Sequence, residues 1–219
     1  MKKDLYIFGA GELGKIILYH FFHSGLYNIK GFVVDDSFFK ENNFCDLPVY
    51  KESEFLQINK NGVEIFIALG PKEMNRSRKE CFEKYLDRGY QFASFIGKNV
   101  ICESEIGKNC FIGHGTIINP FVNIGNNNII WEGCIISNNV NIGDHNYISP
   151  AVNIGTFCEV KDQIIIGTNS TIKTRVIIEE KSLIGSSCYI SQNTIKCGVY
   201  GEKTTKCYGD RSELIDISM

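Results

Sequence analysis

The sequence predicts two structural parts: an α/β domain, half of a Rossmann-like fold, over residues 1–93, and an all-β parallel β-helix over residues 94–197. A C-terminal tail follows over residues 198–219. The first part alternates apolar, β-branched runs with helical segments, which is the pattern of a parallel sheet with crossover helices. The second part returns to an aliphatic residue every six positions, which is the pattern of a parallel β-helix.

The composition argues against several classes of protein. Of the 219 residues, 43% are hydrophobic and 22% are charged, as in ordinary globular domains. Lys and Arg total 23 against 25 Asp and Glu, so the net charge of -2 gives no sign of a nucleic-acid partner. No apolar run is long enough to span a membrane and the N-terminus does not fit a signal peptide, so we expect a cytoplasmic protein. Nine cysteines without a C-x-x-C pair favour neither a disulfide framework nor a metal site.

The α/β prediction begins with a strand, a glycine-rich turn and a helix. The run DLYIFG is apolar, GAGELGK has glycines spaced as G-x-G-x-x-G, and KIILYHFFHSG has the composition of a helix. In that context Gly9 and Gly11 permit a tight turn and a close approach of phosphate to the backbone. A nicotinamide cofactor is the alternative ligand, although half of the dinucleotide fold is missing. Further strands are predicted in IKGFVVDD, LPVY and VEIFIALG, and a second helix in MNRSRKECFEKYLDRG.

The β-helix prediction depends on one uninterrupted register. Sixteen consecutive positions six residues apart are all Val or Ile, and no insertion breaks the series, so no long loop should protrude. The positions are Val100, Ile106, Ile112, Ile118, Ile124, Ile130, Ile136, Ile142, Ile148, Ile154, Val160, Ile166, Ile172, Ile178, Ile184 and Ile190.

A second series lies two residues before each of these positions and consists mostly of small side chains. Residues two apart on a strand point to the same face, so both series should line the interior. Four cysteines belong to this second series, and we interpret them as interior packing residues rather than catalytic thiols. They are Cys110, Cys134, Cys158 and Cys188.

These motifs together resemble a family of bacterial sugar acyltransferases, which includes sialic-acid O-acetyltransferases and the N-acetyltransferase of bacillosamine synthesis. The resemblance runs from YIFGAGELGK and VVDD through IALGPKEMNRSRK to the hexapeptide tract. It implies a left-handed β-helix with three hexapeptides per 18-residue coil and a homotrimer. It also implies acetyl-CoA bound between neighbouring β-helices as co-substrate, and a nucleotide-linked amino sugar or a sialic-acid-like sugar as acceptor.

The resemblance further assigns binding residues. The glycine loop and the acidic residues after the second strand should face the nucleotide of the sugar; for Lys15 and Arg76, a solvated charge on a helix is the alternative. The segment GTFCEVKDQIIIGTNS should contact CoA through its backbone, while Trp131 should pack at a subunit interface. The expected sugar-nucleotide residues are Gly9, Gly11, Lys15, Asp35, Asp36, Gly70 and Arg76, and the expected CoA residues are Gly155, Thr156, Gly167 and Thr168.

The catalytic pattern departs from the family at one position. The family carries a histidine base four residues before an Ile-Gly pair, and this position is Asn138 here. Asparagine orients groups by hydrogen bonds but does not accept a proton at neutral pH. The remaining candidates are His145 and His114, the latter predicted to stack on Glu132, which is one 18-residue coil later. A surface turn is the alternative for both histidines, and His20 and His23 are interpreted as packing or surface residues.

The resemblance thus implies an acetyl-CoA-dependent acyltransferase in surface glycan biosynthesis. Because a free amine needs a base less than a hydroxyl does, the Asn138 replacement favours N-acylation, and O-acetylation of a sialic acid stays open as the alternative. The alternative is a non-catalytic homologue that binds a nucleotide sugar or scaffolds a glycan-assembly complex.

Overall fold

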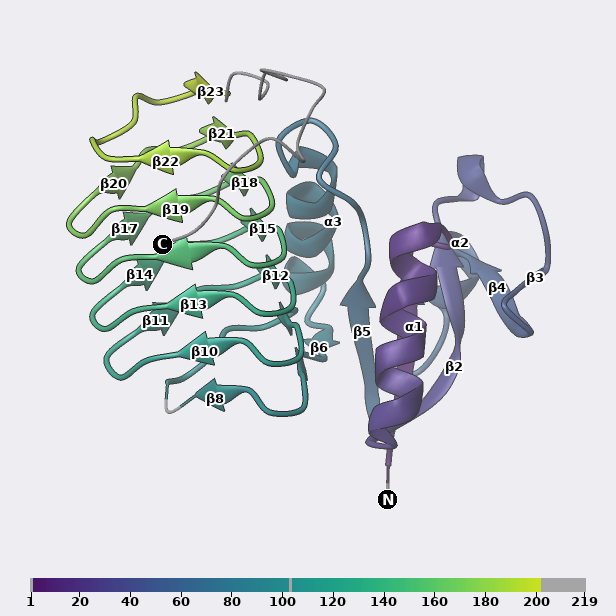
Figure 1. Cartoon of the computed structure of the whole chain (residues 1–219). Coiled ribbons are helices and arrows are strands. Elements are labelled where there is room, and N and C mark those ends of the chain that lie inside the picture. Colours follow the sequence, from purple (N-terminus) through teal and green to yellow (C-terminus); the bar gives the residue numbers. More distant parts are fainter. Residues whose placement is uncertain (1, 103, 202–219) are drawn as a thin grey trace, which may run out of the picture.

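A computed structural model describes residues 2–102 and 104–201 (Figure 1). Its α/β part forms a six-stranded sheet. The strand order is β3-β4-β2-β1-β5-β6, and all pairs are parallel except β3–β4. The elements in chain order are β1 Lys3–Phe8, α1 Glu12–Ser24, β2 Tyr27–Val34, the 3-10 turn η1 Asp36–Phe38, β3 Asn43–Phe44, β4 Leu47–Lys51, α2 Glu52–Phe55, β5 Val63–Ile67, α3 Arg76–Asp87 and β6 Gln91–Phe92.

The two long helices cover opposite faces of this sheet. Side chains alternate along β1, so Leu5 packs with Phe21 of α1 while Tyr6 shares a core with Phe82 of α3. The predicted strands and helices are therefore confirmed, including the strand–glycine–helix start.

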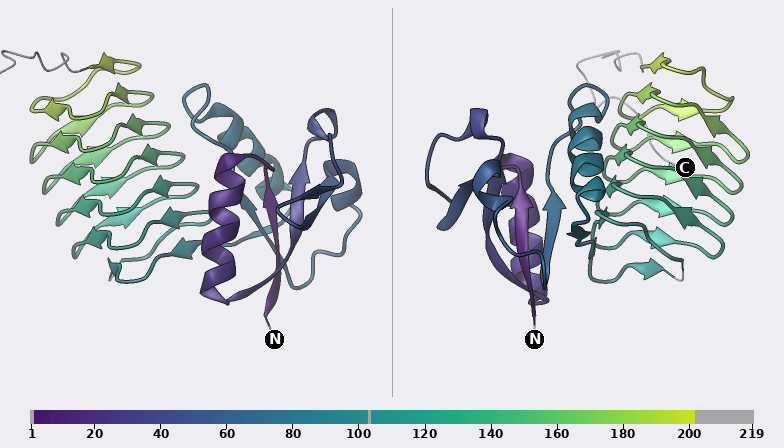
Figure 2. Two further views of the ribbon diagram at one scale, coloured as in Figure 1. Left: turned by 45° about the vertical axis from the view of Figure 1, so that its right-hand side comes forward. Right: turned by 180° about the vertical axis from the view of Figure 1, so that it is seen from behind.

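The second part is a parallel β-helix of two-residue strands (Figures 1 and 2). The strands form three sheets, with the orders β8-β10-β13-β16-β19-β22, β11-β14-β17-β20 and β7-β9-β12-β15-β18-β21-β23. Their bounds are β7 Phe95–Ile96, β8 Ile101–Cys102, β9 Phe111–Ile112, β10 Ile117–Ile118, β11 Asn123–Ile124, β12 Ile129–Ile130, β13 Ile135–Ile136, β14 Asn141–Ile142, β15 Tyr147–Ile148, β16 Asn153–Ile154, β17 Glu159–Val160, β18 Ile165–Ile166, β19 Thr171–Ile172, β20 Ile177–Ile178, β21 Leu183–Ile184, β22 Tyr189–Ile190 and β23 Val199–Tyr200.

One coil contains 18 residues, because Ile118 pairs with Ile136 and Ile136 with Ile154. The predicted register therefore holds, and each coil contains three hexapeptides. The end of the solenoid differs from the prediction, because β23 lies in the segment predicted as a tail and pairs with β21. Tyr200 packs against the interior, which keeps this segment on the solenoid. The remainder of the predicted tail, 202–219, lies outside the described residues.

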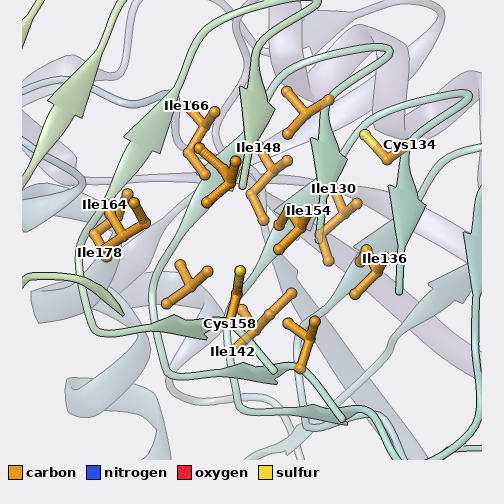
Figure 3. Packing of buried hydrophobic residues seen from close by; sticks show 14 of the residues in the cluster. Ile130, Cys134, Ile136, Ile142, Ile148, Ile154, Cys158, Ile164, Ile166 and Ile178 are labelled. Carbon is orange, nitrogen blue, oxygen red and sulfur yellow. The ribbon is translucent and has the colours of Figure 1, made fainter. Parts of the chain in front are cut away.

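The interior contains both predicted series (Figure 3). The second series does more than fill space, because its polar members donate hydrogen bonds to carbonyl groups 15 residues later. The Cys134 thiol donates to Ser149 O at 3.2 Å, and the Thr116 hydroxyl donates to Trp131 O at 3.0 Å. Burial raises the pKa of Cys134 to about 11, so this cysteine is a protonated packing residue.

The coil turns form three columns, which we name corner A (113–116 and its repeats), corner B (119–122) and corner C (107–110). Every sixth residue from 109 to 187 has a positive φ and lies in one of these turns. At that position corner A has mostly small residues, corner B mostly large ones, and corner C mostly polar ones. They are Gly115, Gly133, Ala151, Asn169 and Ser187 at A, Phe121, Asn139, Phe157 and Arg175 at B, and Asn109, Asn127, His145, Gln163 and Lys181 at C.

The α/β part packs along the solenoid, with α3 beside it in both views (Figures 1 and 2). Phe95, Phe111 and Ile129 belong to the same core as α1. Corner C contacts α3 through polar groups: the guanidinium of Arg78, fully buried, donates to His145 O and Asn146 O at 3.1 and 3.0 Å. Among the described helices, none has the length and apolarity needed to cross a membrane.

Candidate functional site

A cavity of about 1130 Å³ opens at the carboxyl ends of β1, β2 and β5, where ligands bind in parallel α/β sheets. Four of the predicted sugar-nucleotide residues line it, and Lys84, which the sequence analysis missed, also lines it. The Lys84 ammonium is 2.7 Å from a Glu52 carboxylate oxygen. The four predicted residues are Gly9, Gly11, Asp35 and Gly70.

The three glycines of the loop have different surroundings. Gly9 has a φ of +113°, and a Cβ there would lie 2.8 Å from Ala68 O. A Cβ on Gly14 would lie 2.0 Å from Gly9 O, so Gly14 allows α1 to pack on the loop. Gly11, which lies at the N-terminus of α1, has no heavy atom within 4 Å of its Cβ position. Of the three loop glycines, only Gly11 has open space at its Cβ position, and it lines the cavity.

The two predicted carboxylates also organise the loop after β2. Asp35 accepts hydrogen bonds from the Ser37 hydroxyl at 2.5 Å and the Ser37 amide at 2.9 Å, and these bonds lower its pKa. Asp36 accepts from the Ser53 amide at 3.0 Å. Asp35 lines the cavity, whereas Asp36 does not.

Lys15 and Arg76 lie away from this cavity. Lys15 lines a separate hollow of about 680 Å³ between α1 and β2. Arg76 is exposed and its guanidinium lies 2.6 Å from the Glu73 carboxylate. Neither side chain therefore lines the cavity that the other predicted residues share, and their role in sugar-nucleotide binding stays a prediction.

On the β-helix, Asn138 and Thr156 occupy the same turn of consecutive coils in corner B. The Phe157 amide donates to Asn138 O at 3.1 Å, and the Thr156 hydroxyl lies 3.3 Å from that of Thr174. Gly155 is in this corner, whereas Gly167 and Thr168 are in corner A, so the expected CoA residues fall on two different columns.

Corner B also has aromatic side chains that the sequence analysis missed. Phe121 is 76% exposed and Phe157 is 52% exposed, and they lie one coil before and one coil after Asn139. The Arg175 guanidinium lies 4.8 Å from the Phe157 ring centroid. The signal available in the sequence was the presence of large side chains at a turn position of the repeat, where small or polar residues are usual.

His114 and Glu132 lie in corner A as predicted, but a histidine from the other part of the chain contacts both. His114 Nε2 is 3.2 Å from His20 Nδ1, and His20 Nε2 is 3.7 Å from a Glu132 carboxylate oxygen. The Lys98 amide donates to His114 Nδ1 at 2.6 Å. His20 is 9% exposed, so its interpretation as a packing residue is confirmed, with polar contacts that sequence did not indicate.

His145 is buried in corner C rather than exposed on a surface turn. It is 5% exposed, and its Nδ1 lies 2.8 Å from Asn127 Nδ2. Burial lowers its pKa to about 4, because the neighbouring Asp144 only partly offsets the desolvation of a charged ring. The imidazole is thus enclosed between α3 and the coils.

Trp131 packs between the two parts of the same chain. Its ring centroid is 5.3 Å from that of Phe111 and 6.1 Å from that of Tyr147, in the core that also contains α1. These contacts lie within one chain, and the expected position of Trp131 at a subunit interface stays a prediction. Within the described residues, no group of three or more His, Cys, Asp or Glu side chains could hold a metal ion.

Two family models match the chain: the PglD N-terminal domain over residues 4–85 and the bacterial transferase hexapeptide over residues 103–138. A comparison with curated proteins gave no match.

Among solved structures, the chain is similar to the acetyltransferase domain of PglB from Neisseria gonorrhoeae in complex with acetyl coenzyme A, at 18% identity, TM-score 0.75 and coverage of 87% of this chain and 93% of that chain. It is also similar to WeeI from Acinetobacter baumannii, at 18% identity, TM-score 0.75 and coverage of 90% and 93%.

A third similar structure is a histidine-to-alanine variant of GDP-perosamine N-acetyltransferase from Caulobacter crescentus with CoA and GDP-perosamine. Identity is 18% and the TM-score 0.74, over 94% of this chain and 97% of that chain. At this identity the three structures establish the fold. The chain therefore matches the PglD N-terminal domain model in its α/β part and the bacterial transferase hexapeptide model in its β-helix, the combination that its motifs predicted.

Proposed function

We propose that this protein is an acetyl-CoA-dependent N-acetyltransferase that acts on a nucleotide-linked amino sugar in surface glycan biosynthesis. The observation that carries the proposal is the cavity at the glycine loop, where Gly11 leaves space open beside the N-terminus of α1. Free amide groups at a helix N-terminus suit the phosphates of a sugar nucleotide. The match of nearly the whole chain to acetyltransferases solved with CoA or acetyl-CoA supports the same activity.

The reaction forms a C–N bond between the sugar amine and the thioester carbonyl and breaks the C–S bond, so that CoA leaves as the thiol. The amine must lose a proton. His145 is enclosed, and both ring nitrogens of His114 have partners, so neither is free to accept it. In the proposed mechanism the proton passes to water that Asn138 orients in corner B, and the reaction draws on the fraction of acceptor that is already a free amine.

A thiol-release assay with acetyl-CoA and a panel of nucleotide-linked amino sugars, including GDP-perosamine, tests this proposal. The wild-type pH profile should follow the ionisation of the acceptor amine. Asn138→His should raise turnover by roughly 10²–10⁴-fold, because it supplies a general base. His114→Ala is the control and should leave the shape of the pH profile unchanged. No thiol release by either wild type or Asn138→His would favour the non-catalytic homologue instead.

The proposed enzyme is a homotrimer in which a neighbouring chain covers corner B. Exposed Phe121 and Phe157, together with Ile135 on the adjacent face, form an apolar surface that is unfavourable in water. Light scattering should report about three times 24.7 kDa. Phe121→Asp should dissociate the assembly, whereas Phe22→Asp, on an exposed face of α1, should not. A monomeric wild type at micromolar concentration would remove the trimer from the proposal.

A further inference from the structure

We propose that His20 is a proton-sensitive positioning residue: while neutral it ties α1 to the first coils of the β-helix, and on protonation it releases that contact. The inference does not depend on the proposed function. It rests on the direction of the hydrogen bonds that run from Lys98 through His114 to His20, and on the contact between His20 and the Glu132 carboxylate.

The first bond fixes the protonation of His114. A backbone amide can only donate, so His114 Nδ1, 2.6 Å from the Lys98 amide, must be an acceptor. A neutral His114 then carries its proton on Nε2, which faces His20 Nδ1 at 3.2 Å. His20 Nδ1 is therefore also an acceptor, and the His20 proton is on Nε2, facing the Glu132 carboxylate at 3.7 Å. With both rings neutral, every donor faces an acceptor.

One additional proton has no place in this arrangement. On His20 it would occupy Nδ1 and face the Nε2–H of His114, and on His114 it would occupy Nδ1 and face the Lys98 amide. Either position puts two donors against each other, so one contact must break. His20 cannot move away within its pocket, because its ring packs against Phe95 and Phe111 with centroids 5.1 and 5.0 Å apart.

The other groups around His20 do not change this conclusion. The titratable or charged groups that face it are His114 and Glu132 from the coils and His23 from α1, and the Tyr19 ring is also in contact. Burial, His114 and His23 disfavour the charged ring, and Glu132 only partly compensates, so the pKa of His20 is lowered. Protonation is therefore coupled to opening of the contact, where the free ring regains an ordinary pKa.

Release of His20 acts on α1 as a whole. The helix begins at Glu12, directly after Gly11, and both residues line the large cavity. The same helix therefore connects the corner A contact to the wall of that cavity. Acid should weaken the attachment of α1, and with it of this wall, to the coils.

Hydrogen exchange of the amides of α1, corrected for intrinsic rates, tests the proposal between pH 5.5 and 7.5. Protection of residues 12–24 should fall with decreasing pH, by up to about tenfold per unit below about pH 6.5. His20→Gln should remove this dependence, because the amide accepts from His114 and donates to Glu132 without titrating. His23→Gln is the matched control on the exposed side of the same helix and should keep the wild-type dependence.

Two results would overturn the proposal: protection of α1 that does not change with pH in the wild type, or a wild-type slope in His20→Gln. If that variant does not fold, nitrogen NMR of the wild-type imidazoles provides the second measurement. It should show the Nε2–H form of both His20 and His114 at pH 7.5, and an Nδ1–H form of either ring would contradict the bond directions. The effect of His145 on local hydrogen exchange can be told apart from that of His20 by its location, since His145 contacts α3 (76–87) and not α1.

Discussion

Gly11 and Gly14 are three residues apart in one loop, yet substitution should affect them in opposite ways. The Cβ position of Gly14 is occupied by the Gly9 carbonyl oxygen, so this residue is needed for folding. The Cβ position of Gly11 is empty and its φ is -125°, which any residue adopts, so this residue is needed only for what the cavity holds.

Gly11→Val should therefore leave the fold intact and lower nucleotide affinity by at least about tenfold, because the new side chain occupies space where phosphate approaches the backbone. Calorimetric titration with UDP and GDP measures the affinity, and circular dichroism checks the fold. Gly14→Ala is the contrasting variant and should lower the unfolding midpoint. Unchanged nucleotide binding in Gly11→Val would mean that the loop serves only to pack the strand on the helix.

His145 should make the stability of the protein depend on pH. Its pKa is about 4 in the folded chain and about 6.5 when unfolded, so between these values only the unfolded chain takes up the proton. Stability should fall as pH decreases through this window, by about 2 kcal/mol at pH 5 and about 3 kcal/mol at pH 4 relative to neutral pH.

Urea unfolding of wild type and His145→Gln measures this contribution. Glutamine still accepts from Asn127 and matches the Asn109, Asn127 and Gln163 side chains of the same corner, so the variant should lose less stability in acid. The difference between the two proteins isolates His145 from other groups such as His20. Equal acid destabilisation in both would show that His145 does not contribute.

The histidines show what sequence spacing can and cannot predict. The 18-residue coil brought Glu132 next to the column of His114, because that relation is internal to the repeat. The contact of His20 with both residues arises from the packing of α1 on the solenoid, and nothing in the local sequence encodes that distance. The burial of His145 depends in the same way on α3.

At the scale of the element, each coil turn requires one residue with left-handed backbone. For most residues other than glycine and asparagine, that conformation costs about 1–2 kcal/mol of folding free energy. Corner A provides a matched set, since Gly115, Gly133 and Ala151 lie in the same column with φ values of 69°, 67° and 58°.

Gly115→Ala and Gly133→Ala should each cost about 1 kcal/mol, and Ala151→Gly should gain a similar amount or somewhat less, because glycine loses more entropy on folding. No heavy atom lies within 4 Å of the Cβ position of either glycine, so steric clash does not complicate the comparison. Chemical denaturation gives the three values. Three effects of the same sign would indicate that side-chain contacts, and not backbone strain, decide stability at this corner.

The elements of the β-helix were predictable because the repeat itself is the structural unit, and both interior series kept their register. The short η1, α2 and β3 were not predicted, since segments of two to four residues have no periodicity to detect. The strand formed by Val199 and Tyr200 was also not predicted, because β23 pairs with β21 at a spacing of 16 residues and not 18.

At the scale of the whole molecule, the α/β part supports only some of the coils. Within the described residues, hydrogen bonds between the two parts extend along corner C as far as Ile164, whose carbonyl accepts from Asn75 at 3.2 Å. Later coils contact mainly their neighbours, and solenoid stability is a sum of such neighbour terms. The last coils should therefore open first.

The interior cysteines report this order, because Cys110, Cys134, Cys158 and Cys188 are spread along the solenoid and are all buried. In native protein a thiol reagent should modify exposed Cys45 and Cys197 at once. With increasing urea, Cys188 should become reactive first and Cys110 last. Mass spectrometry of the labelled peptides measures this order. Simultaneous labelling of all four would mean that the chain unfolds as one cooperative unit.

The end of the corner C contacts near Ile164 also determines where such a protein can change length during evolution. A duplication of one complete 18-residue coil beyond this point would keep every interior residue, every left-handed turn and every bond to α3. A duplication of six residues would preserve the interior pattern but rotate all later coils by one face. A duplication before Ile164 would displace part of corner C from α3, which it contacts. Relatives of different length should therefore differ by whole coils, added at the free end of the solenoid.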